Sequence, residues 1–240
     1  EAADLGSIST NRELFIKPQL VKFSTQSTCI KSIFAGQWSS YAVTEDGDLY
    51  AWGLNNYFQL GFRTEKPVEL PNLDISINTM CYLQAELTPV HVSTPATISK
   101  VVAVSCGQQH LAVLDAEGHV FTIGSAFYGK LGHGKEFVDS LEDGSCDTLK
   151  QISPQVFDHN RIAFVECGDF SSFAITESGR LYAWGQGSSH IGTKEGEDLF
   201  QPTPVGGAFA ADTRFLTGSS GSQFGGWIGV PKNDSDSATN

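Results

Sequence analysis

Apolar residues recur in three similar blocks along the chain, which read IFAGQWSSYAVTEDGDLYAWG (33–53), VSCGQQHLAVLDAEGHVFTIG (104–124) and VECGDFSSFAITESGRLYAWG (165–185). Each block opens with apolar residues at alternate positions, which is typical of a half-buried strand. A continuous apolar run follows, as expected for a strand covered on both faces. After a short polar stretch, a third apolar run ends each block. The pattern therefore predicts three short strands in each block.

Glycines keep the three blocks in one register. In each block two further glycines follow the first one at offsets of 11 and 17, giving positions 36, 47 and 53, then 107, 118 and 124, then 168, 179 and 185. The middle glycine suits the end of a three-residue hairpin loop, where a left-handed backbone conformation excludes most side chains. No stretch has a convincing period of 3.6 residues, so we expect an essentially all-β chain.

The register continues beyond the third strand. The segment GLNNYFQLG (53–61) matches GSAFYGKLG (124–132), whereas GQGSSHIG (185–192) is one residue shorter. A constant inner spacing with variable connections indicates one repeated unit with insertions in its loops. Units of about 40 to 50 residues built from short antiparallel strands have the size of propeller blades. We predict a β-propeller of four-stranded blades, in which the small residues before the first glycines pack tightly near the axis.

The blocks divide the chain into six segments. We expect the end of a preceding blade, a blade with a long insertion, two further blades, a degenerate partial blade and a disordered tail, at residues 1–32, 33–100, 101–160, 161–205, 206–230 and 231–240. In the partial blade, Gly221 matches Gly107, and we expect the hairpin pattern to be lost after it. Because three to four blades form only an arc, we expect the chain to be a piece of a longer protein.

The residues after the third strand carry a family resemblance. A strand that ends in Trp-Gly and is followed by NNYFQLG (55–61) resembles the repeat of the regulator of chromosome condensation family, whose members are seven-bladed propellers. The resemblance covers residues 13–205. In it, AWGLNNYFQLG, VSCGQQHLAVLDAEGHVFTIGSAFYGKLGHG and YAWGQGSSHIGTKEGEDLFQPTPV follow the order of the C-terminal half of the family's exchange factor. It implies an arc of about three to four blades of a seven-bladed ring.

The resemblance also implies a function. It points to part of a guanine-nucleotide exchange factor for the small GTPase Ran, which promotes GDP release through loops on the propeller rim and associates with chromatin in the nucleus. Such a factor binds the nucleotide-free GTPase more tightly than the loaded one and changes no covalent bond. We therefore expect no enzyme, no catalytic residue and no cofactor. The alternative is a non-catalytic propeller scaffold, for example in a ubiquitin ligase or a trafficking adaptor.

Two residues are candidates for contact with the GTPase. The resemblance aligns His110 with a family histidine that faces the GTPase, although a histidine bonded to a neighbouring blade is an equally open interpretation. The other copies have Ser39, Ser171 and Phe224 at this position. Asn56 lies in a loop that belongs to the same rim in the family pattern. It does not recur, because Phe127 replaces it in the second copy, and this favours a contact role over a structural one.

The net charge of the chain limits the classes of partner that it is expected to bind. With 27 acidic and 15 basic residues, the formal net charge is −12. This charge disfavours direct binding to nucleic-acid phosphates and suits a basic protein partner, such as histones in chromatin or the basic surface of a GTPase. Acidity that only supports solubility is an equally open interpretation. No apolar run reaches 18 residues, so we expect no membrane partner.

The cysteine, histidine and glycine-lysine motifs do not indicate a disulfide, metal or nucleotide site. The five cysteines have no CxxC spacing, and Cys106 and Cys167 replace Ala35 at the equivalent position, so they indicate small buried residues in a reducing compartment, nucleus or cytoplasm. The six histidines lack the spacing of a metal site. Residues 129–136 (GKLGHGKE) resemble a phosphate-binding loop, but Glu136 stands where Ser or Thr would bind magnesium, and we expect no helix after the loop.

Overall fold

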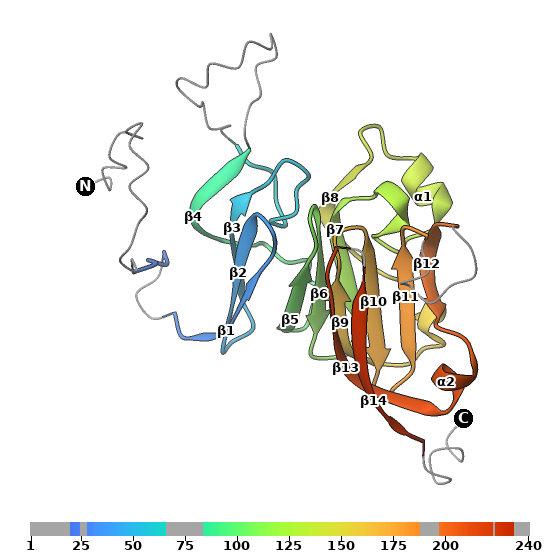
Figure 1. The fold of residues 1–240 in the computed structure, drawn as a ribbon. Coiled ribbons are helices and arrows are strands. Elements are labelled where there is room, and N and C mark those ends of the chain that lie inside the picture. The colour runs from blue at the N-terminus through green and yellow to red at the C-terminus, as the bar shows by residue number, and fades with distance from the viewer. Residues whose placement is uncertain (1–19, 25–27, 66–83, 188–196, 223, 233–240) are drawn as a thin grey trace, which may run out of the picture.

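The computed structural model describes residues 20–24, 28–65, 84–187, 197–222 and 224–232. In this part, three sheets have four antiparallel strands in consecutive order and one has two. The strands of the three larger sheets are β1 (Ile30–Ala35), β2 (Ser39–Thr44), β3 (Leu49–Leu54) and β4 (Ala85–His91); β5 (Val101–Cys106), β6 (His110–Asp115), β7 (Val120–Ser125) and β8 (Ser145–Gln151); β9 (Ile162–Cys167), β10 (Ser171–Thr176), β11 (Leu181–Gly185) and β12 (Leu199–Pro204). The last sheet pairs β13 (Thr213–Ser220) with β14 (Gly225–Pro231). The arrangement confirms a partial propeller of four-stranded blades (Figure 1).

The hairpins form as the glycine spacing predicts. Gly47, Gly118 and Gly179 have φ angles of +90°, +80° and +84°, in the left-handed region where a side chain is strained. The second and third strands of every blade pair in the same register, since Ser39, His110 and Ser171 each lie opposite the glycine that ends the block. The recurring glycines therefore mark equivalent points of three hairpins that share one register.

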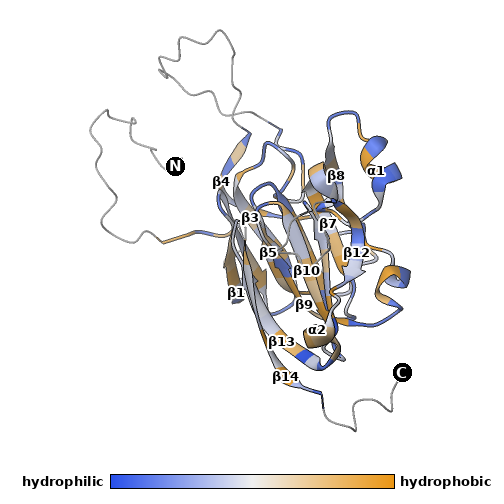
Figure 2. Ribbon diagram, turned by 45° about the vertical axis from the view of Figure 1, so that its right-hand side comes forward, coloured by the Kyte–Doolittle hydropathy of each residue, from blue (hydrophilic) through white to orange (hydrophobic). Residues whose placement is uncertain are grey.

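Apolar side chains fill the space between neighbouring blades. One cluster joins the first and second blades, a second joins the second and third, and a third joins the third blade to the β13–β14 sheet. The continuous apolar runs form β2, β6 and β10, and every residue of β6 and β10 is buried. Figure 2 shows the sheets stacked beside one another.

The first strand of each blade is called its inner strand, which gives β1, β5, β9 and β13. Neighbouring inner strands approach one another closely at the glycines that follow them. A Cβ atom on Gly36 would lie 2.6 Å from the Cys106 sulfur, and one on Gly168 would lie 2.8 Å from the Gly221 carbonyl oxygen. A Cβ atom on Gly107 would collide with the carbonyl oxygen of Gly168. Tight packing along the inner strands, predicted from the small residues at these positions, is thus present at all three junctions.

The β13–β14 sheet begins a fourth blade. The amide of Gly221 donates to the carbonyl of Phe224 at 2.8 Å, as Gly36 donates to Ser39. The expectation that the hairpin pattern ends after Gly221 is wrong, because residues 225–231 pair with β13 through backbone hydrogen bonds that need no apolar alternation. Three parts of the predicted pattern lie mostly or wholly outside the described residues: the tail from 233, the third-copy segment 188–192 and the expected end of a preceding blade at 1–32.

Within the described ranges, two short helices interrupt the β-structure, α1 (Lys135–Asp139) and α2 (Ala208–Ala211), together with the 3₁₀ turns η1 (Phe127–Gly129) and η2 (Pro154–Phe157). The expectation that no helix follows the loop 129–136 is therefore corrected by α1. Phe137 and Val138 of α1 pack against a small buried cluster beside β8, and this tertiary contact stabilises a helix too short to produce a visible period.

Candidate partner-binding rim

The loops of each blade lie at two opposite ends of the strands. We call the end that carries the loops 36–38, 53–61, 107–109, 124–132 and 168–170 the glycine-loop rim. The opposite end carries the hairpins 45–47, 116–118 and 177–179 and is called the hairpin rim. In Figure 1 the glycine-loop rim is at the top, beside α1, and α2 lies at the other end. Both candidate residues, His110 and Asn56, come from strands and loops at the glycine-loop rim.

Aromatic side chains are exposed on the glycine-loop rim. Trp38 is 58% exposed, Phe127 is 49% exposed and Tyr128 is 42% exposed. Tyr128 contacts the ring of Phe170 from the third blade edge to face, with 5.9 Å between the ring centres. Exposed aromatic residues that come from successive blades are typical of protein-binding surfaces, because they bury a large area at a small entropic cost.

Asn56 lies on this rim with its side chain exposed. Its Oδ1 accepts a hydrogen bond from the backbone amide of Gln84 at 2.9 Å, and the amide nitrogen of Asn56 makes none to the described residues. The preceding Asn55 is instead fully buried and bonds to Leu60, Phe62 and Thr64 within its own loop. Asn55 therefore holds the loop, while the free amide of Asn56 is available to a partner.

His110 lies below the rim surface, and its side chain is fully buried. The Ser172 hydroxyl donates to the carbonyl of Lys130 at 2.8 Å, so its oxygen accepts the proton of His110 Nε2, also at 2.8 Å. Nδ1 is then the unprotonated nitrogen, and it has no hydrogen-bond partner. Burial, followed by the charge of Lys130, holds the pKa of His110 well below its usual value. The neutral imidazole thus links the second blade to the third.

Lys130 is a feature of this rim that the sequence did not reveal. Its side chain is only 1% exposed, and it makes no ion pair or hydrogen bond to the described residues. Its ammonium lies 5.9 Å from the centre of the Phe170 ring. Burial lowers its pKa from 10.5 to about 8. A buried lysine was hard to predict at this position from the sequence, because the first blade has a different polar residue there, Gln59, which is also buried.

The remaining motifs have no catalytic geometry in the described residues. α1 has only five residues and carries Glu136 in its first turn, which disfavours phosphate at this end. Four cysteines of the described residues are free. Cys167 is buried as expected, whereas Cys106 is only half-buried and Cys29 is exposed; Cys81 lies outside the described residues. Among the described residues, no three histidine, cysteine or acidic side chains gather as a metal site requires. None of their helices is long and apolar enough to cross a membrane.

Comparison with protein families agrees with this architecture. Residues 46–114 match the regulator of chromosome condensation (RCC1) repeat. Residues 30–59 and 162–190 match a second description of the same repeat. The chain belongs to the regulator of chromosome condensation family. Its RCC1 repeats are the blocks that the glycines keep in register.

Several curated proteins are similar over most of the chain. The human protein named regulator of chromosome condensation is 32% identical over 191 residues, which are 79% of this chain and 39% of that protein. Its counterpart in Xenopus laevis is 29% identical over 88% of this chain and 44% of that protein. The human probable E3 ubiquitin-protein ligase HERC3 is 32% identical over 83% of this chain and 16% of its own length. The chain spans less than half the length of each of these relatives.

Solved structures show the same fold. Prp20p from Saccharomyces cerevisiae superimposes with a TM-score of 0.69 at 20% identity, over 86% of this chain and 45% of that one. Human WBSCR16 superimposes with a TM-score of 0.65 at 21% identity, over 89% of this chain and 47% of that one. The four sheets of this chain therefore correspond to a contiguous part of an RCC1-like propeller.

Proposed function

We propose that this chain is part of a guanine-nucleotide exchange factor for the small GTPase Ran, and that it binds the GTPase through the glycine-loop rim. The observation that carries the proposal is the family membership, combined with exposed aromatic residues on one rim and with an exposed Asn56 amide nitrogen that bonds to none of the described residues. The structure of Prp20p is described together with its binding to Gsp1p and histones. Exchange by differential affinity requires neither a catalytic residue nor a cofactor.

Within this proposal, Asn56 contacts the GTPase directly. Capture of the chain on immobilised nucleotide-free Ran should be five- to tenfold weaker for Asn56→Ala, since an interfacial hydrogen bond contributes about 1–1.5 kcal/mol. Glu177→Gln, on the hairpin rim, is the control and should be captured like the wild type. Equal capture of Asn56→Ala and wild type would remove this residue from the interface.

His110 is proposed to act on the same interface through the loop above it. Because its imidazole is buried against Ser172, and Ser172 holds the carbonyl of Lys130, loss of the histidine should loosen the loop 124–132. His110→Ala and Ser172→Ala should therefore weaken Ran capture by similar factors. A loss seen with His110→Ala alone would instead indicate direct contact by the histidine.

A non-catalytic scaffold is the second candidate, and the similarity to HERC3 favours it. The two functions differ in their dependence on nucleotide. An exchange factor should capture nucleotide-free Ran at least tenfold better than GDP-loaded Ran, whereas a scaffold should not discriminate. Capture of neither form would overturn the Ran proposal. We place the exchange factor in the nucleus, on chromatin, with histones as basic partners of its acidic surface.

A further inference from the structure

A pocket lies on the hairpin rim of the first blade, at the opposite end from the proposed Ran interface. It has a volume of about 460 Å³, which is within the range of small-ligand sites. Exposed carboxylates of Glu45, Asp46 and Asp48 line it together with Tyr50 and His91. No lysine or arginine among the described residues lines this pocket.

Comparison with the later blades shows that the first blade lacks a basic side chain at this pocket. The residue seven positions before the first glycine of each copy is Cys29, Lys100, Arg161 or Arg214. The backbone there is equivalent, because Cys29 accepts a hydrogen bond from the amide of Glu45 at 3.0 Å, as Arg161 accepts one from Glu177 at 2.9 Å. Cys29 thus stands where the later copies have a basic residue.

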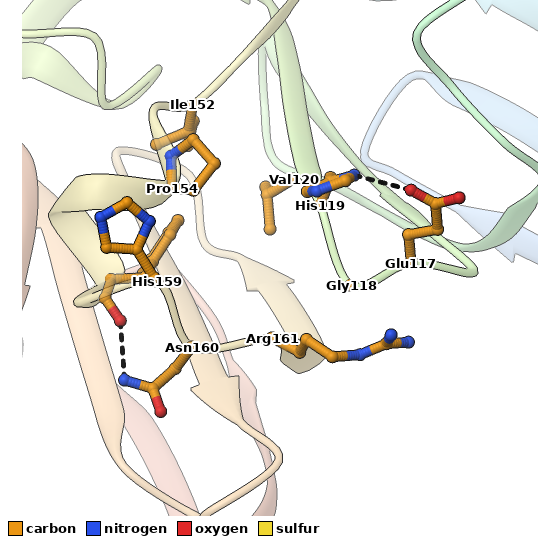
Figure 3. A pocket seen from close by; sticks show the side chains of 10 residues that line it. Glu117, Gly118, His119, Val120, Ile152, Pro154, His159, Asn160 and Arg161 are labelled. Atoms are coloured by element: carbon orange, nitrogen blue, oxygen red, sulfur yellow. Dashed lines mark hydrogen bonds and ion pairs between the residues drawn. The ribbon is translucent and has the colours of Figure 1, made fainter.

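The guanidinium of Arg161 shows how such a basic residue is held. Its Nε donates to the carboxylate of Glu177 at 3.0 Å, and its Nη2 donates to the carbonyl of Ala116 in the preceding blade at 2.9 Å. Figure 3 shows Arg161 across from the hairpin of the second blade, at a pocket of only about 50 Å³. In the first blade, Glu45 has the position of Glu177, but it has no ion-pair partner among the described residues.

A second set of polar contacts in the third blade also has no counterpart among the described residues of the first blade. In the third blade, Tyr182 and Arg180 both donate to one oxygen of Asp158, at 3.1 and 2.8 Å. Tyr50 has the position of Tyr182 and is only 4% exposed, yet its hydroxyl makes no hydrogen bond to the described residues. Asp48 replaces Arg180, so a negative charge stands where the third blade has a positive one. Among the described residues, the carboxylate of Asp48 pairs only with His91, at 3.6 Å.

We propose that this pocket receives an arginine side chain from a basic segment of a partner protein. A guanidinium is always charged and presents five donors in one plane, so it can bond to two carboxylates and a phenol oxygen together. The net charge of −12 favours the approach of a basic segment. Since a single exposed ion pair contributes little, the three carboxylates must act together with the buried phenol. The inference does not depend on nucleotide exchange.

The test uses the 240-residue chain and a fluorescent peptide, Gly-Arg-Gly-Arg-Gly, with binding followed by anisotropy. The same peptide with citrulline in place of arginine keeps the shape and removes the charge, and it should bind at least tenfold more weakly. Glu45→Gln and Asp48→Asn should each weaken arginine-peptide binding at least threefold. Tyr50→Phe should weaken it less, and it should fold normally because Phe121 has this position in the second blade.

Cys29→Arg gives the decisive variant, because it supplies from within the chain the cation that Arg161 supplies in the third blade. It should abolish peptide binding and leave the circular dichroism spectrum and melting temperature of the fold intact. Glu177→Gln removes a carboxylate that already has a partner and should leave binding unchanged. Equal binding of the citrulline peptide, or undiminished binding to Cys29→Arg and Glu45→Gln, would overturn the proposal. Displacement of the peptide by calcium at equal concentration would overturn it too, in favour of a metal site.

Discussion

At the scale of single residues, the inner glycines set how closely the blades approach. Gly107 is the most constrained of them, because a Cβ atom there would meet both the Gly168 carbonyl and the His110 ring. Neither neighbour can move without shifting an inner strand or the His110–Ser172 hydrogen bond. The requirement for glycine at this point therefore arises from the next blade, and not from the conformation of Gly107 itself.

Gly107→Ala should lower the free energy of unfolding by about 1–3 kcal/mol, the usual cost of overpacking a tight site. Gly206→Ala is the matched control, since a Cβ atom at Gly206 would have no neighbour within 4 Å. Urea unfolding followed by circular dichroism measures both. Equal midpoints for the two variants would show that the junction can relax at no cost.

Lys130 leads to a prediction about pH. Its pKa is about 8 in the folded chain and near 10.5 when unfolded. Between these values the unfolded chain holds the proton that the folded chain has lost, so stability should rise as pH increases from 8 to 10.5. Lys130→Gln removes the buried charge and should stabilise the fold at pH 7 by about 1–3 kcal/mol. This advantage should shrink towards pH 10.5. A constant difference across that range would contradict the argument.

At the scale of elements, a carboxylate joins the third blade to the β13–β14 sheet. Glu166 of β9 accepts hydrogen bonds from the amide of Ser220 at 3.0 Å and from the hydroxyl of Ser219 at 3.3 Å. Its other oxygen accepts from Ser105 of β5 at 3.2 Å. One side chain therefore connects three successive inner strands, and β13 has few other polar contacts with β9.

Glu166→Ala should loosen β13 and β14 selectively. Hydrogen exchange at residues 213–231 should become about tenfold faster, which corresponds to about 1.4 kcal/mol of lost local stability. Exchange in β10 and β11 should not change. Glu177→Ala, which removes an exposed carboxylate paired with Arg161, serves as the control. Uniformly faster exchange throughout the chain would point to global destabilisation instead.

An element could be predicted from the sequence where local conformation restricts the residue type, and not where it depends on contacts between distant residues. The hairpins at Gly47, Gly118 and Gly179 were predictable because a positive φ restricts the residue type locally. β14 was not, since its glycine-rich sequence lacks apolar alternation, although its backbone pairs with β13. At the site, the failure of Asn56 to recur indicated a contact role, which stays a prediction, and the structure places its side chain at the surface. A His110 bonded to the neighbouring blade was one of two open interpretations, and the sequence could not decide between them because the contact depends on Ser172, which lies 62 residues further along the chain.

At the scale of the whole molecule, the chain has a net charge of −12, and few ion pairs among the described residues offset the repulsion between its acidic side chains. Self-repulsion of this kind destabilises the compact state and is screened by salt. The melting temperature at pH 7.5 should therefore rise by a few degrees between 20 and about 300 mM NaCl. Near pH 5, where protonation of carboxylates reduces the net charge, the rise should be smaller. A fall in melting temperature with salt would show that attractive pairs dominate.

The long connection between β3 and β4 has a practical consequence. Tyr50 pairs with His91, and Leu54 with Ala85, in the same arrangement in which Phe121 pairs with Gln151 and Ser125 with Ser145, although the second blade joins its strands by a shorter path. The added length thus leaves the sheet geometry untouched. We therefore expect the pairing of β3 with β4 to tolerate further changes in the length of their connection.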